Sequence, residues 1–152
     1  MRSKVALANV VLLTVTTIPL CASGIDDKIF DQQSIDTMAA KAKLAQPREQ
    51  CFLYAQLVHG MTELSVRQYA AGDVAKAAEL LKQIQPLAQK IHLSMAGSDK
   101  RLKDAEILLR HTAFRLNEML HTSSFEDRPL VEQTLAQVSQ VQNQAMMQVF
   151  SR

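Results

Sequence analysis

The chain has no tryptophan and few of the residues from which catalytic loops are usually built. Its 152 residues include two tyrosines, four glycines and four prolines. Active sites are commonly assembled on loops, and phosphate-binding loops are rich in glycine. No nucleophile elbow, phosphate-binding loop or zinc-ligand spacing occurs in the sequence. We therefore expect a protein that is not an enzyme and has neither catalytic residues nor a metal site.

Charge is missing from a long stretch near the start of the sequence. Residues 1–23 contain Arg2 and Lys4, then the apolar run VALANVVLLTVTTIPL, then the small residues of CASG. This is the layout of a secretory signal peptide. The run is shorter than the roughly 20 apolar residues that cross a bilayer, and Pro19 interrupts its end. We expect cleavage after Ser23 or Gly24, a periplasmic or secreted protein, and no stable membrane span after cleavage.

Cysteine is also scarce, with only Cys21 and Cys51. Cleavage of the signal removes Cys21, which leaves one thiol and excludes an intramolecular disulfide. Alternatively, Cys21 is retained as the lipidated first residue of a lipoprotein, although Leu20 before it is larger than such signals usually allow. We expect Cys51 to be a small buried residue on a helix.

An excess of positive charge is absent once the signal is removed. The whole chain has 17 basic and 15 acidic residues, and loss of Arg2 and Lys4 makes these numbers equal. The densest basic group, Lys100, Arg101 and Lys103, has no aromatic residues interleaved for stacking on bases. Nucleic acid is therefore not an expected partner.

What the sequence does contain is helical periodicity. From Gln46 onward the turn signals are few, and they predict four helices at 47–71, 74–96, 98–121 and 128–150. Each has about 24 residues and a length of about 36 Å. The predicted helix-ending and capping residues are Gly72 with Asp73, Gly97 with Ser98, and Asp127 with Pro129 in the first turn.

Four helices of matched length with short connections predict an all-α fold, an up-down-up-down four-helix bundle over residues 47–152. The second helix supports the bundle most clearly, because one apolar row keeps its spacing on both sides of Pro86. We therefore expect a kink at Pro86 and not a break in the helix. That row is Val74, Ala77, Leu81, Ile84, Ala88, Ile91 and Met95. In the last helix, Gln142 replaces an expected apolar residue and either fixes the register or faces the rim.

The N-terminal segment, residues 24–46, is expected to be partly helical. Ser34 is the expected cap of a short helix with an inner apolar face. This helix either packs across the bundle or precedes it loosely.

The third predicted helix carries a second row besides its main apolar stripe. The row is spaced four, three, four and three, and consists of Ile107, His111, Phe114, Glu118 and His121. Two explanations are open: the N-terminal helix covers this row, or the row is a docking surface for a protein or a second copy, with histidines that respond to pH. Glu118 and His121 also have the Glu-x-x-His spacing of di-iron bundles, but only one such motif is present, and it faces away from the main stripe.

One hairpin resembles a known family. Gly72, Val74, Ala77 and His92 are similar to the final hairpin of soluble periplasmic b-type cytochromes of the four-helix class. This resemblance implies His92 as a haem ligand, with Met61 on the neighbouring helix as a candidate partner. The family's pattern ends where this chain continues for two more helices, and no CxxCH attachment site is present. We therefore expect no cofactor and an exported protein that acts by protein–protein interaction in the cell envelope, with haem or metal binding as the alternative.

Overall fold

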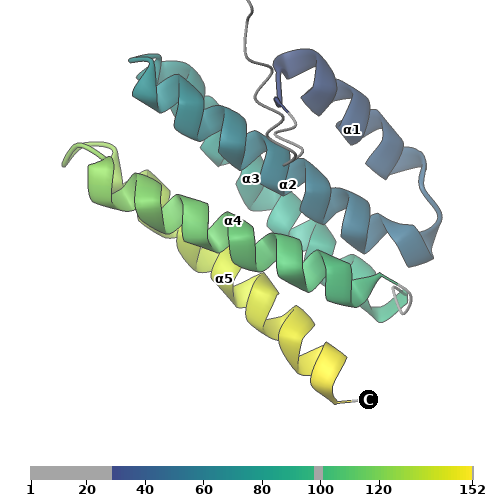
Figure 1. Cartoon of the computed structure of the whole chain (residues 1–152). Helices are drawn as coiled ribbons and strands as arrows, with labels where there is room; N and C mark the ends of the chain where they lie inside the picture. The colour runs from purple at the N-terminus through teal and green to yellow at the C-terminus, as the bar shows by residue number, and fades with distance from the viewer. Residues whose placement is uncertain (1–28, 98–100, 152) are drawn as a thin grey trace, which may run out of the picture.

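The computed structural model describes residues 29–97 and 101–151. The expected signal peptide, with Cys21, lies outside these ranges, as does Ser98. Within them every regular element is helical, so the all-α class is confirmed (Figure 1). The elements are α1 (Gln32–Leu44), α2 (Pro47–Ala70), α3 (Val74–Ser94), the short 3₁₀-helix η1 (Met95–Gly97), α4 (Leu102–Thr122) and α5 (Arg128–Phe150).

The five α-helices pack against each other around α2. Helix α2 contacts α1, α3 and α4, and α5 contacts α3 and α4. Consecutive helices are thus close neighbours in the pairs α2/α3 and α4/α5, whereas α3 and α4 lie across a diagonal of the four longer helices. As a result α2 and α4 run side by side in the same direction, and so do α3 and α5 (Figure 1).

The turn between α2 and α3 has the predicted geometry. Gly72 has a φ of 86°, in the left-handed region that favours glycine. The Gly72 N–H donates to Tyr69 O at 3.0 Å, and the Asp73 N–H donates to Gln68 O at 2.8 Å. This pair of bonds is a Schellman motif, which satisfies carbonyls at the end of α2. Asp73 precedes α3 as predicted, but its carboxylate pairs with Lys76 at 3.3 Å and makes no capping bond.

Two other helix starts differ from the prediction in position or role. Helix α4 begins at Leu102, four residues later than expected, and the guanidinium of Arg101 lies 3.3 Å from the centre of the Phe52 ring on α2. Asp127 precedes α5 as expected, yet its carboxylate makes no capping bond. It accepts hydrogen bonds from Tyr69 Oη at 3.1 Å and Ser124 Oγ at 2.6 Å. Asp127 thus ties the end of α2 to the turn between α4 and α5.

The prediction that Ser34 caps α1 is wrong. The N-cap is Asp31, whose Oδ1 accepts from the Ser34 N–H at 2.7 Å, while Ser34 Oγ accepts from the Asp31 N–H at 2.9 Å. This reciprocal capping box satisfies two backbone donors at once, so the helix begins three residues earlier. The hydrogen bond from the Ser34 N–H is the main reason that the pKa of Asp31 lies below its usual value.

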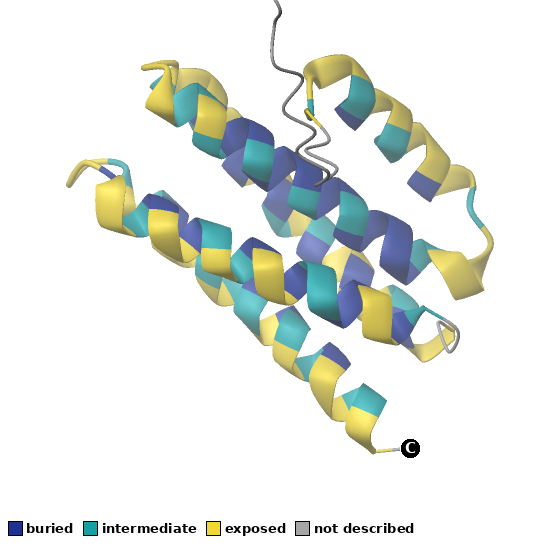
Figure 2. Cartoon of the chain, in the orientation of Figure 1, coloured by how far each residue is buried: buried dark blue, intermediate teal, exposed yellow. Residues whose placement is uncertain are grey.

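Helix α2 supplies the largest share of the core because it is covered on three sides (Figure 2). Cys51 is fully buried there, as expected. Helix α3 continues through Pro86 but ends at Ser94, two residues earlier than predicted. Every member of the predicted row is buried except Val74, which is half-buried, and the last member, Met95, lies in η1. Gln142, the polar residue in the last apolar row, donates from Nε2 to Glu106 Oε1 on α4 at 2.9 Å. Of the two roles considered for Gln142, this contact favours fixing the register.

Helix α1 rests on α2 at Gly60. A Cβ atom at this position would lie 2.7 Å from Phe30 Cδ1 and 2.9 Å from Met38 Cε. These distances are shorter than ordinary van der Waals contact, so a Cβ atom here would force the Phe30 and Met38 side chains to shift. Ile35 and Ala42 are the buried residues of α1.

Candidate functional site

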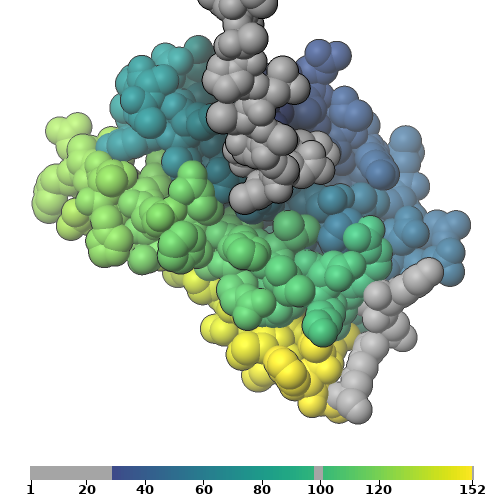
Figure 3. All heavy atoms as spheres, in the orientation of Figure 1, coloured from purple at the N-terminus to yellow at the C-terminus, as the bar shows by residue number. Residues whose placement is uncertain are grey.

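The predicted partner row lies along the outer side of α4, which we call the α4 face. Ile107 is half-buried there, and the other four residues, His111, Phe114, Glu118 and His121, are exposed. Phe114 exposes 60% of its surface. Helix α1 packs against α2 and leaves these side chains open, and α4 lies on the side of the molecule turned to the reader in the space-filling view (Figure 3). Among the described residues, therefore, the N-terminal helix does not cover the α4 face.

A polar cluster that the sequence did not indicate joins α2 to α4 beside this face. Its centre is His59, whose Nδ1 lies 3.2 Å from Thr112 Oγ1. Thr112 Oγ1 donates its own hydrogen to Leu108 O at 2.8 Å. Thr112 therefore accepts from His59, which places the imidazole proton on Nδ1. The Phe30 ring meets the His59 ring edge-on, with centroids 6.0 Å apart, so the cluster also contacts the start of the α1 region.

Arg115 continues the cluster along α4. Its Nε and Nη2 donate to the two carboxylate oxygens of Glu63 on α2, at 2.8 and 3.2 Å, and its Nη1 donates to Glu118. The hydrogen bonds to Glu63 raise the pKa of Arg115 above its usual value. Two carboxylates share one guanidinium, so this group of three side chains has a net charge of −1 next to the α4 face. Glu118 is thereby held in a defined position.

His59 is electrostatically distinct from the exposed histidines. Burial lowers the pKa of His59, and the charges of His111 and Arg115 lower it further, while Glu63 acts in the opposite direction. The lowered pKa favours the neutral imidazole, and the neutral form with its proton on Nδ1 makes the hydrogen bond to Thr112.

The two candidate haem ligands are not brought together. Ser65 Oγ donates to Ala77 O at 3.0 Å, which fixes the register of the antiparallel pair α2 and α3. In this register Met61 lies level with Leu81 of α3. His92 is eleven residues further along α3 than Leu81, so Met61 and His92 are separated by about 16 Å along the helix axis. Met61 is buried, whereas His92 is exposed. One iron atom between these two side chains is incompatible with that register.

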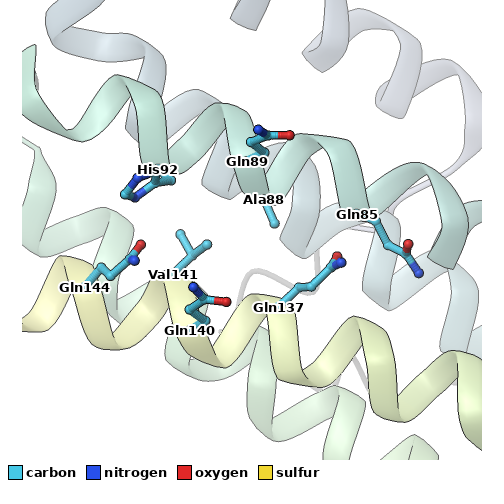
Figure 4. A pocket seen from close by; sticks show the side chains of 8 residues that line it. All are labelled: Gln85, Ala88, Gln89, His92, Gln137, Gln140, Val141 and Gln144. Carbon is cyan, nitrogen blue, oxygen red and sulfur yellow. The ribbon is translucent and has the colours of Figure 1, made fainter.

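His92 instead lies at one end of a groove between α3 and α5 (Figure 4). The groove has a volume of about 270 Å³ and is lined by Gln85, Ala88, Gln89, His92, Gln137, Gln140, Val141 and Gln144. We call it the glutamine groove. The sequence analysis missed it because isolated glutamines are typical of solvated helix faces. The available signal was the spacing of glutamines three and four residues apart on two helices.

Residues 29–97 and 101–151 contain neither a candidate membrane-spanning helix nor a candidate metal-binding cluster. No helix in these ranges is long and apolar enough to cross a membrane. They also contain no group of three or more His, Cys, Asp or Glu side chains placed to hold a metal ion. Glu118 and His121, the pair with di-iron spacing, are both exposed on α4.

Comparisons with known proteins add no family to this description. Neither protein-family models, nor curated protein sequences, nor solved structures gave a match to the chain.

Proposed function

We propose that the protein is exported and acts in the cell envelope by protein–protein interaction, without catalysis, and that the α4 face binds a second copy of the chain. Residues 47–152 would serve as one up-down-up-down four-helix bundle domain, with α1 of the N-terminal segment attached to it. The observation that carries the proposal is the exposed Phe114 at the centre of a row spaced like one side of a coiled coil.

The row is self-complementary if two copies of α4 pack antiparallel about a two-fold axis at Phe114. In that arrangement Phe114 faces its own copy, His111 lies opposite Glu118 of the second copy, and Ile107 lies opposite His121. A two-fold interface uses the same patch on both subunits, so each favourable contact occurs twice. Burying two phenylalanine rings against each other also removes apolar surface that a monomer exposes to water.

The charges of the α4 face favour this pair in mildly acidic solution. Histidine gains a positive charge between about pH 8 and pH 5. The group of Glu63, Arg115 and Glu118 carries one net negative charge in each copy, so a protonated His111 of the second copy would meet an opposite charge. The pKa of His59, which faces the same region from α2, is lowered by burial, so His59 gains its charge at a lower pH than an ordinary histidine. Acidification should therefore strengthen association.

Light scattering coupled to size-exclusion chromatography tests the proposal at about pH 5 and about pH 8. The wild type should be dimeric at the lower pH, and Phe114→Ser, alone or with Ile107→Ser, should be a folded monomer. Leu93→Ser is the matched control, because Leu93 is 71% exposed on α3, away from the α4 face. A wild type that is monomeric at both pH values, or a Phe114→Ser variant that still dimerises, would contradict the proposal.

Export is tested separately. Expression of the full-length sequence followed by cell fractionation and N-terminal sequencing should place the protein outside the cytoplasm, beginning at Gly24 or Ile25. Retention of Met1 in a cytoplasmic fraction would exclude the signal-peptide interpretation, and a lipidated Cys21 at the N-terminus would support the lipoprotein alternative.

A further inference from the structure

The glutamine groove is lined by hydrogen-bonding side chains without formal charge. Five carboxamides and one imidazole form its walls, while Ala88 and Val141 are buried at its floor. Among the residues that the structure describes, no Asp, Glu, Lys or Arg lines it. A carboxamide presents two donors and an acceptor with two lone pairs, the same chemistry as a peptide bond. The groove is therefore suited to a neutral ligand that both donates and accepts hydrogen bonds.

Two of the carboxamides leave hydrogen-bonding capacity unused. The Oε1 atoms of Gln137 and Gln144 are buried and accept no hydrogen bond from any residue in the described ranges. Both side chains reach from α5 toward α3, with Gln144 opposite His92 (Figure 4). Buried polar atoms in proteins are nearly always hydrogen-bonded, and one without a partner costs free energy. Both oxygens belong to residues that line the groove, so a ligand with free donors would satisfy them once the carboxamides turn toward it.

The dimensions of the groove match a short extended peptide. From Gln85 to His92 on α3, and from Gln137 to Gln144 on α5, the lining spans seven residues of helix, or about 10 Å. Helices α3 and α5 run side by side in the same direction, so the two walls stay level with each other (Figure 1). Three residues of extended chain also span about 10 Å, and their backbone groups on one side repeat about every 6.6 Å. Gln137 and Gln144 are seven residues apart on α5, or about 10 Å, so they lie near the two ends of such a segment.

We propose that the glutamine groove binds an uncharged, extended peptide segment of about three residues through its backbone N–H and C=O groups. This site is independent of the α4 face and goes beyond the proposed self-association. The N–H groups of the peptide donate to Gln137 and Gln144, and its carbonyls accept from the carboxamide N–H groups of the groove. His92 contacts one end of the segment.

A helical partner would not meet the same need, because its backbone N–H and C=O groups are already bonded to each other. A charged segment would lose hydration without gaining an opposite charge in the groove. An extended neutral segment avoids both costs, because every residue of it brings one donor and one acceptor that are free.

Nuclear magnetic resonance of the ¹⁵N-labelled protein, expressed from its full-length sequence, tests the proposal. The probe is the capped tripeptide acetyl-Gly-Ala-Gly-amide, titrated to millimolar concentration. The side-chain NH₂ signals of Gln137 and Gln144 should shift and saturate, while those of Gln133, exposed on α5 outside the groove, should not. The same tripeptide with methylated backbone nitrogens and a C-terminal dimethylamide cannot donate and should cause no shift.

The variant Gln137→Leu/Gln144→Leu should lose the saturable response at Gln140, and Gln133→Leu should keep it. No saturable shift with the tripeptide would overturn the proposal. Equal shifts with the methylated tripeptide would also overturn it, as would shifts caused by maltose and not by the tripeptide, which would indicate a carbohydrate. The comparison of the two tripeptides uses the wild type alone and so does not depend on whether the double variant folds.

Discussion

His59 Nδ1 on α2 donates to Thr112 Oγ1 on α4 across 3.2 Å, beside the ring of Phe30. This contact joins three parts of the chain that are distant in sequence. Partial burial of His59 lowers the pKa of its imidazole, and the charges of His111 and Arg115 nearby lower it further. The same relationship that stabilises the packing of α2 on α4 therefore makes it sensitive to acid.

We predict that the free energy of unfolding falls as the pH is lowered below about 6.5, the usual pKa of histidine. The pKa of His59 is lower in the folded protein, so the unfolded chain binds more protons in this range. Stability contributed by neutral His59 is complete above about pH 6.5 and is lost progressively toward the folded-state pKa. Urea unfolding at a series of pH values measures this slope.

His59→Gln should unfold with a smaller dependence on pH, because glutamine does not titrate. His121→Gln is the control, since His121 is exposed at the end of α4. The interpretation fails if the pH dependence of His59→Gln equals that of the wild type.

Helix positions were largely predictable from the sequence, whereas helix neighbours were not. Gly72 and Pro47 marked real helix boundaries, and the row from Ala77 to Ile91 was recognised as the buried side of α3. These features depend on local turn chemistry and on periodicity. The diagonal relation of α3 to α4 depends on where each helix finds a complementary surface, and a connection of a few residues does not specify it.

The candidate sites were less predictable for the same physical reason. The α4 face follows from one helix alone, and its exposed residues were identified from their spacing. The pairs His59/Thr112 and Glu106/Gln142 depend on the rotation and register of two helices. The glutamine groove requires α3 and α5 to lie side by side, which the predicted order of neighbours did not contain.

A second prediction concerns the packing of the α1 region on α2 at Gly60. Gly60→Ala would place Cβ 2.7 Å from the Phe30 ring, and overpacking of this kind costs about 1–3 kcal/mol. The higher helix propensity of alanine, worth about 1 kcal/mol, opposes this cost. We expect a net loss of protection from hydrogen exchange in α1, with α3 and α5 unchanged.

Phe30→Ala combined with Gly60→Ala should restore part of the loss, because the small residue removes the clash. Gly97→Ala is the matched control, since a Cβ there would have its nearest contact at 3.8 Å. If the backbone amides of α1 exchange equally fast in the wild type and in Gly60→Ala, the close packing at Gly60 does not stabilise α1 on α2.

A third prediction concerns the buried carboxylate of Glu106. Gln142→Leu removes its hydrogen bond from α5. Within the described part of the chain this leaves only Arg110, at 3.9 Å, which is mostly exposed. An unsatisfied buried charged group costs about 1–3 kcal/mol or more, so we expect a loss of this size in urea unfolding. Glu106→Leu combined with Gln142→Leu should recover most of it, because an apolar pair needs no partner. A double variant that is less stable than Gln142→Leu alone would contradict this account.

A fourth prediction concerns the effect of the buried oxygens of the glutamine groove on the stability of the free protein. Gln137→Leu and Gln144→Leu each remove a buried oxygen that accepts no hydrogen bond from the described residues, so each should raise the free energy of unfolding by about 1 kcal/mol. Gln133→Leu, at an exposed position of the same helix, should have no such effect. Thr62→Val, which removes a buried unpartnered hydroxyl from α2, should stabilise the protein for the same reason. If the two groove variants lose stability while Thr62→Val gains it, the groove carboxamides contribute to the fold of the free protein, and their unbonded oxygens are no reason to expect a ligand.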